Sequence, residues 1–389
     1  MCVGVWISVM GTKRFGENNL AYDVFYFFNL RFNKNEVMPL YMDIHTVDSD
    51  TFSVEDVVKA HMEDLAVQER FGVIQLKYWV NVDAKTLFCL MEGPDKEACH
   101  QVHKQSHGNT ACNIIEVSDN EFNLFMGVGT HLNDLAQTQS GELDSGYRTI
   151  LLTNIVCFSN NRASHIKEVH RLFDKHNGVL ILDPCNEIMV SFIYASDAIS
   201  CALSINELLK SIPDRFEYNL AVFSGRPVDE EGDNLFEETK MKVQGLCSLG
   251  LTNMMYLDRE AKLLSDKDFR DQKPLHKGFI PVNNEDAKFL LQLSGILNKS
   301  LISSELKIQD LSTSLNLSKS QVYRKTKALT GVSPNQLIQE SRLQRAVNGL
   351  TDSSKTIAEI AYESGFNSPA YFTRVFKKRF GLLPTEFSR

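Results

Sequence analysis

Five of the ten histidines in this 389-residue chain fall within residues 38–117, and their spacing suits metal binding. His100, His103 and His107 recur at i, i+3 and i+7, which places all three on one face of a helix. Neutral imidazoles grouped in this way suit nickel, zinc or copper, whereas magnesium and calcium prefer oxygen ligands. The pattern therefore predicts a transition-metal site in the first part of the chain.

A structural role for these histidines stays open. His61 shares a helical stripe with Val57 and Leu65, which is the pattern of a hydrogen-bonded core histidine. His107 lies near the end of its predicted helix, where a positive charge is favourable. Cys89 alternates with apolar residues along a predicted strand and is expected in the core rather than among metal ligands.

The last segment of the chain contains an internal repeat. Residues 308–311 recur as residues 357–360, and each copy continues into a turn and a longer helix rich in Arg and Lys. The turns contain Asn316 and Gly365, residue types that tolerate the left-handed backbone of a tight helix–helix turn. The repeat predicts two helix-turn-helix units.

The charge distribution agrees with this prediction. Residues 299–389 hold 14 Lys and Arg against 7 Asp and Glu, a net charge of +7, whereas the whole chain carries −8. The rest of the chain therefore carries −15. A basic C-terminal region on an acidic body indicates a polyanionic partner at one end only.

Two α+β regions precede the helical segment. A capping box at Ser53 and Asp56 begins a helix, and apolar residues alternate from Ile74 to Val82 as in a strand. The order βαββαβ is predicted once over residues 38–118 and again from Tyr147, and this order is typical of a ferredoxin-like fold. The predicted organisation is an N-terminal extension or misassigned start over 1–37, a metal-binding domain over 38–118, a linker over 119–147, a second α+β domain over 148–264, a linker over 265–283 and an all-α DNA-binding domain over 284–389.

The C-terminal repeat resembles the AraC family of bacterial transcription regulators. LSKSQVYRKTKALTGVSPNQLIQESRLQRA resembles the first helix-turn-helix of that family, and IAEIAYESGFNSPAYFTRVFKKRFGLLPTEFSR resembles the second. The resemblance implies that the second helix of each unit enters a major groove of DNA. The residues that would then face the bases are Ser320, Tyr323, Arg324, Ala370, Thr373 and Arg374. Arg suits bidentate recognition of guanine. The residues expected to neutralise phosphates are Lys319, Lys327, Lys377, Lys378 and Arg379.

The first α+β region is similar to a small family of nickel-binding ferredoxin-like proteins. The similarity runs from YMDIHTVDSD to VHKQSHG and implies His45, His61, His103 and His107 as metal ligands. Because these ligands would lie on a helix face outside the core, replacing His103 and His107 is expected to leave the fold intact.

Residues 148–258 resemble a class III nucleotide cyclase domain, in the segments TILLTNIVCFS and HRLFDKHNGVLILDPCNEIMVSF. The two metal-binding aspartates of such enzymes correspond to Asn154 and Asn186 here. The base-reading Lys and the transition-state Asn and Arg correspond to Leu182, Met241 and Gly245. Amide and apolar side chains cannot supply the charge that phosphoryl transfer needs, so no catalytic residue is predicted. A dimerisation module and a ligand-sensing domain remain as alternatives for this region.

These patterns predict a cytoplasmic transcription regulator that binds double-stranded DNA as a homodimer. Nickel, another transition metal or a small molecule is expected as its effector. No apolar run reaches the roughly 18 residues that a membrane-spanning helix needs, and the eight cysteines form no C-x-x-C pair, as in a chain with reduced thiols. The alternatives are a metal-handling protein whose DNA-binding domain regulates its own gene, and a nucleotide-dependent enzyme, against which Asn154 and Asn186 argue.

Overall fold

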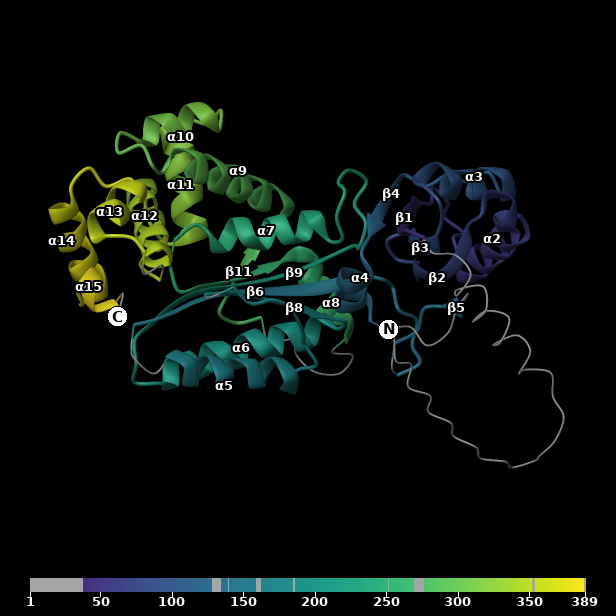
Figure 1. Ribbon diagram of the computed structural model, residues 1–389, viewed down its shortest axis with the longest axis horizontal. Coiled ribbons are helices and arrows are strands. Elements are labelled where there is room, and N and C mark those ends of the chain that lie inside the picture. Colours follow the sequence, from purple (N-terminus) through teal and green to yellow (C-terminus); the bar gives the residue numbers. More distant parts are fainter. Residues whose placement is uncertain are drawn as a thin grey trace, which may run out of the picture. The chain divides into compact units, whose positions relative to one another are not determined.

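The computed structural model describes residues 38–127, 134–138, 140–158, 162–184, 186–250, 252–268, 276–351 and 354–387. The expected N-terminal extension, residues 1–37, lies outside these residues. Pro39–Arg389 form one compact unit. It contains two α+β sheets followed by a helical region (Figure 1).

The first sheet is built in the predicted order, strand, helix, two strands, helix, strand. Its elements are β1 (Leu40–Thr46), α2 (Val54–Val67), η1 (Gln68–Phe71), β2 (Ile74–Asn81), β3 (Thr86–Glu92), α3 (Lys96–Ser106) and β4 (Asn113–Val117). The strand order is β4-β1-β3-β2-β5, antiparallel except where β2 meets β5. The predicted capping box begins α2, since the Ser53 hydroxyl accepts from the Asp56 amide at 3.3 Å and the Asp56 carboxylate accepts from the Ser53 amide at 3.2 Å.

The segment 119–147, expected as a linker, contains further structure. Ser118 caps α4 (Asp119–Met126), whose Phe122, Phe125 and Met126 are buried. The chain then adds the short strand β5 (Asp134–Leu135) to the edge of the first sheet. These three apolar side chains lie on one face of α4 and anchor the segment in the hydrophobic core. The polar composition of the segment as a whole does not predict this packing.

The second sheet repeats the first order and then extends it. Its elements are β6 (Arg148–Cys157), α5 (Arg162–Lys175), β7 (Val179–Leu182), β8 (Glu187–Phe192), α6 (Ala195–Ser211), β9 (Phe216–Gly225), α7 (Glu237–Cys247), β10 (Met254–Asp258), α8 (Arg259–Asp268) and β11 (Phe279–Val282). The strand order is β11-β10-β9-β6-β8-β7, in which β10 and β11 join in parallel. Part of the expected linker 265–283 is therefore strand β11.

The helices of this region lie on both faces of the second sheet (Figure 1). Leu151 of β6 packs in a cluster with Ala198 of α6, whereas its neighbour Leu152 packs in another with Val243 of α7. Successive side chains of a strand point to opposite faces, so α6 and α7 cover opposite sides of the sheet.

The remaining elements are helices: α9 (Asn284–Ser300), α10 (Ile308–Ser314), α11 (Lys319–Thr330), α12 (Pro334–Leu350), α13 (Ile357–Glu363), α14 (Pro369–Phe380) and α15 (Pro384–Phe387). Asn316 has φ 51° and Gly365 has φ 84°, which confirms the prediction of left-handed turn residues between α10 and α11 and between α13 and α14. Ser318 and Thr356 cap the helices that follow them through capping boxes. No helix among the described residues is long and apolar enough to cross a membrane.

One cluster of buried apolar side chains crosses all of these regions. It includes Met42 of β1, Phe125 of α4, Leu246 of α7, Leu293 of α9 and Val322 of α11. The two α+β regions therefore share one hydrophobic core with helices α9, α10 and α11.

Candidate functional site

Strand alternation brings two polar residues of β1 under the helices of the first sheet. Tyr41 of this strand packs with Val57 of α2 and Val102 of α3, whereas Met42 packs in the cluster on the other face. Asp43 and His45 lie two and four residues after Tyr41, so their side chains point to the same face of the sheet and towards the helices. They are 0% and 5% exposed.

A buried network of histidines and aspartates forms at this place. His103 of α3 faces Asp43 Oδ2 through Nε2 at 2.8 Å and Asp64 Oδ2 through Nδ1 at 3.1 Å. His45 Nε2 lies 3.2 Å from Asp43 Oδ2, and His107 Nε2 lies 3.3 Å from Asp64 Oδ1. The three imidazole rings have centroids 4.6 to 6.5 Å apart. Donor atoms from the strand and the helices thus meet in two adjoining groups that share His103.

The charges of the network stabilise one another. A carboxylate only accepts hydrogen bonds, so both nitrogens of His103 donate and the ring is an imidazolium. Burial lowers the pKa of His103, but Asp43 and Asp64 outweigh burial and raise it to about 10. Burial likewise raises the pKa of the Asp43 carboxyl, but His45 and His103 hold it below its usual range. The pKa of Asp64 is lowered for the same reason, by His103 and His107 against burial.

Three of the four histidines predicted as ligands lie in this network: His45, His103 and His107. His61 belongs to neither donor group. Its ring lies 4.3 Å from that of Tyr78, and neither of its buried nitrogens has a hydrogen-bond partner among the described residues. The expectation that His103 lies outside the core is wrong, because this residue is 0% exposed.

Two carboxylates of the site, Asp43 and Asp64, were not predicted, and the thiol of Cys89 was predicted only as part of the core. One ligand atom from each of Asp43, His45, Cys89 and His103 lies within 4.8 Å of the others, and the same holds for Asp64, His103 and His107. Cys89 is buried as expected, yet it also belongs to this donor set. The available signal was the placing of Asp43 two residues before His45 on one strand.

The donor set fits a transition metal. Imidazole nitrogens, carboxylate oxygens and a cysteine sulfur together suit nickel, zinc, copper or iron, whereas magnesium and calcium sites are built of oxygens. Burial raises the pKa of the Cys89 thiol, so this group too must lose a proton in order to ligate. His103 must lose a proton before it can ligate. Asp43 and Asp64 supply negative charge that would compensate a dication in this buried place.

The helical region presents a second candidate site on α11 and α14. Five of the six residues expected to face bases are exposed: Ser320, Tyr323, Arg324, Ala370 and Arg374. Thr373, the sixth, is half-buried. The guanidinium of Arg374 lies 5.4 Å from the ring centroid of the exposed Tyr371. Lys377 and Lys378 are exposed on the same helix, as a phosphate-binding role requires.

Two of the basic residues expected at phosphates have partners within the chain. Lys327 donates through Nζ to the carbonyl of Gly331 at the end of its own helix. Arg379 donates to two carboxylates, Glu217 and Glu340. The structure places Arg379 between elements of the chain, because the guanidinium faces β9 and α12.

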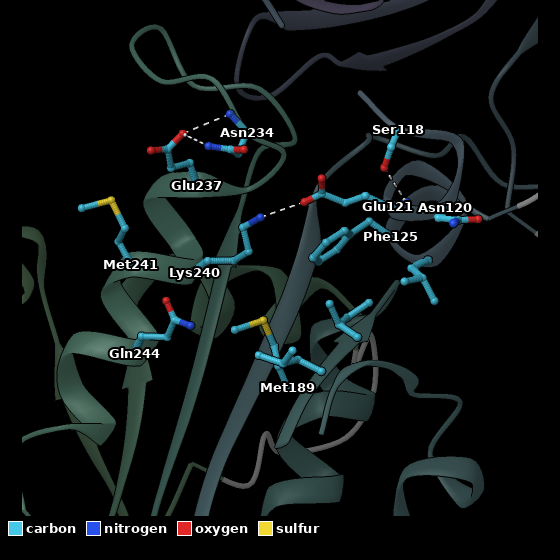
Figure 2. A pocket seen from close by; sticks show the side chains of 13 residues that line it. Ser118, Asn120, Glu121, Phe125, Met189, Asn234, Glu237, Lys240, Met241 and Gln244 are labelled. Carbon is cyan, nitrogen blue, oxygen red and sulfur yellow. Dashed lines mark hydrogen bonds and ion pairs between the residues drawn. The ribbon is translucent and has the colours of Figure 1, made fainter. Parts of the chain in front are cut away.

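A cavity of about 590 Å³ lies between α4, the strands β7 and β8, and α7 (Figure 2). Lys240 donates to Glu121 at 2.9 Å across it and lies 5.6 Å from the ring centroid of Phe125. Leu182 and Met241 also line it, at positions where the cyclase resemblance would require polar side chains. Seven of its thirteen lining residues are polar or charged, so the lining differs from the predominantly apolar wall of a typical small-molecule site.

Comparisons with known proteins match the two ends of the chain. A family model described as nickel responsive protein SCO4226-like matches residues 41–117, and one described as a helix-turn-helix domain matches residues 311–389. The solved structure of SCO4226 from Streptomyces coelicolor A3(2) is 33% identical, covering 20% of this chain and 94% of that chain with a TM-score of 0.19.

The curated relatives are mostly transcription regulators. The HTH-type transcriptional activator RhaR of Mannheimia succiniciproducens is 29% identical over 39% of this chain and 55% of its own length. An uncharacterized HTH-type regulator of Pseudoalteromonas carrageenovora is 29% identical over 32% of this chain and 72% of its own length. Histidine kinase P4 of Formosa agariphila is 30% identical over 31% of this chain, which spans only 9% of that kinase.

The C-terminal region is therefore a helix-turn-helix DNA-binding domain. It is of the AraC type, which confirms the resemblance drawn from the repeat, and the N-terminal region is confirmed as similar to a nickel-responsive family. The resemblance of residues 148–258 to nucleotide cyclases stays a prediction.

Proposed function

We propose that this protein is a cytoplasmic transcription regulator that binds DNA through two helix-turn-helix units and responds to a transition metal, nickel or a metal of similar preference. The DNA-binding part of this proposal rests on one observation. Arg324 and Arg374 are exposed on the second helices of the two helix-turn-helix units. The metal part rests on two adjoining donor groups that share the buried His103, one with Asp43, His45 and Cys89 and the other with Asp64 and His107. The strand orders support ferredoxin-like folds for both sheets, and we take the working form to be a homodimer.

Base recognition by Arg374 can be tested by selecting duplexes from genomic DNA with the full chain. Arg374→Ala should weaken binding to the selected sequence by about 1–3 kcal/mol and relax the preference at one base pair, because a bidentate contact to guanine is lost. Lys378→Gln serves as the control, since losing a phosphate contact should weaken all sequences alike and lower the salt slope by about one. Equal, sequence-independent losses in both variants would rule out base recognition by Arg374.

Metal binding can be measured by titrating the full chain with nickel chloride in a calorimeter. Affinity should rise with pH toward the His103 pKa of about 10, by up to about tenfold per pH unit for one proton released. His107→Gln should weaken binding by more than about tenfold, because it removes a ligand from a half-buried position. His100→Gln, a change on the same helix outside the donor set, should bind as the unchanged chain does.

A purely structural role of the network predicts different results in the same experiments. If the network is purely structural, nickel is not taken up in stoichiometric amounts, and His107→Gln lowers only thermal stability. The DNA selection is then repeated with and without nickel. A metal-responsive regulator should change its DNA affinity when nickel is added, whereas a metal-handling protein should not.

A second effector candidate is a small molecule with polar groups, bound in the cavity between α4 and α7. The charged side chains of Lys240 and Glu121 offer such groups hydrogen-bond partners, and the absence of carboxylates at Asn154 and Asn186 argues for a non-enzymatic second sheet. A nucleotide-dependent enzyme is the less favoured alternative for the same reason.

A further inference from the structure

Arg379 lies at the end of α14, the helix proposed to enter DNA, yet its guanidinium is committed to two carboxylates of this chain. Its terminal nitrogens donate to both oxygens of Glu217 on β9 at 2.7 and 2.9 Å, and Nε donates to Glu340 on α12 at 2.9 Å. Arg215 donates to Glu217 at 3.0 Å and to the carbonyl of Arg379 at 2.6 Å. Bidentate contacts of this type are both strong and directional.

The ion group stands beside an apolar contact between the same elements. Phe158, just after β6, stacks on Phe380 of α14 with ring centroids 4.6 Å apart and planes at 20°. Its ring also lies 5.2 Å from that of Phe387 on α15. Val156 of β6 is buried in one cluster with Phe376 of α14. The last helices therefore use side chains of the second sheet to complete their own core.

Buried hydrogen bonds add a third contact. The side chain of Gln344 on α12 accepts from the Gly250 amide at 2.8 Å and donates to the Cys247 carbonyl at 3.0 Å. The approach is close, since a Cβ on Gly250 would lie 2.8 Å from Cβ of Glu340. Asn186, at the position where the cyclase resemblance implies an aspartate in that family, donates to Asn348 of α12 at 3.4 Å.

The DNA-facing side of α14 stays open in this arrangement. Ala370, Arg374, Lys377 and Lys378 are exposed, whereas the Arg379 side chain is 24% exposed. Arg379 follows Arg374 by five residues, which turns it about 140° around the helix. Docking and DNA binding therefore use different faces of one helix.

We propose that the second sheet is the docking platform of the second helix-turn-helix unit, and that the group Glu217–Arg379–Glu340 is the ionic latch that holds α14 in the orientation in which it meets DNA. Arg379 is thus a positioning residue and makes no phosphate contact. The latch proposal rests on the proposed function in one respect, namely that α14 binds DNA. The docking itself stands on the contacts within the chain.

The test compares Arg379→Gln, Glu217→Gln and the adjacent control Lys378→Gln in the full chain. Backbone hydrogen exchange should speed up at least about tenfold over residues 369–387 in the first two variants, because the open state becomes more populated. Their affinity for duplex DNA should fall severalfold with an unchanged salt slope. Lys378→Gln should leave exchange unchanged and lower the salt slope by about one.

Two outcomes would overturn the latch. One is a salt slope lowered by about one in Arg379→Gln with unchanged exchange, which would make Arg379 a phosphate contact. The other is unchanged exchange in Glu217→Gln, a nearly isosteric change that keeps the DNA-facing charges. If the unchanged chain bound no DNA, the proposed function would fail, and the exchange measurements would still decide whether the second unit is docked.

Discussion

His103→Ala is expected to cost the first region about 3–5 kcal/mol of stability, because it leaves two buried carboxylates without their shared cation. Asp43 and Asp64 are 0% and 2% exposed, and both face His103 within 3.1 Å. The measurement is the free energy of opening of β1 and α3 amides, taken from native-state hydrogen exchange on the metal-free chain.

His100→Ala is the matched control on the same helix. His100 belongs to neither donor group, so the cost should stay within about 0.5 kcal/mol. Adding Asp43→Asn to His103→Ala should restore part of the loss, since it removes one orphaned charge. Equal stability of the two single variants would show that the network contributes nothing to the fold.

The same network fixes the pH range of greatest stability. The pKa values of Asp43 and Asp64 are lowered from 3.8, so their contribution is present above pH 3.8 and is lost as the pH falls through the folded-state values. The pKa of His103 is raised from 6.5 to about 10, so its contribution is complete below pH 6.5 and is lost as the pH rises toward 10. His103→Ala should abolish the alkaline decline.

Gly365→Ala is expected to disrupt the second helix-turn-helix unit and to abolish sequence-specific DNA binding. A Cβ at this position would lie 1.8 Å from the carbonyl oxygen of Leu301, and the backbone has φ 84°. Strain and overpacking together should cost about 2–4 kcal/mol, because the neighbour is backbone and cannot turn aside. Thermal unfolding and duplex titration measure the two effects.

Gly295→Ala provides the control within α9. A Cβ there meets nothing within 4 Å, so alanine should stabilise the helix by about 0.5–1 kcal/mol. If Gly365→Ala instead binds its selected duplex with unchanged affinity, the turn between α13 and α14 tolerates a side chain and the steric argument fails.

The sequence allowed the helical region to be predicted closely because its signals are local. Ser318 and Thr356 begin helices through their own side chains, and Asn316 and Gly365 adopt the turn conformation that their residue types permit. Strands β10 and β11 were missed, because parallel strands pair with partners distant in sequence and lack a turn signal of their own.

The candidate metal site could be predicted only in part. His103 and His107 share a helix face that spacing shows directly, whereas Asp64 joins them from another helix. An aspartate is common on exposed helix faces, so its burial could not be expected from residue type. The intrachain partners of Arg379 could not be predicted for a similar reason, since Glu217 lies 162 residues away.

The shared core that runs from Met42 to Val322 makes this chain a poor source of interchangeable parts. A helix-turn-helix segment moved to another protein would leave behind the apolar contacts around Leu246 and Leu293, and the exposed surface would favour aggregation. Fusion proteins that join the α+β regions of this chain to the helix-turn-helix domain of another protein should therefore be insoluble. Solubility would require matching substitutions on both sides of the junction.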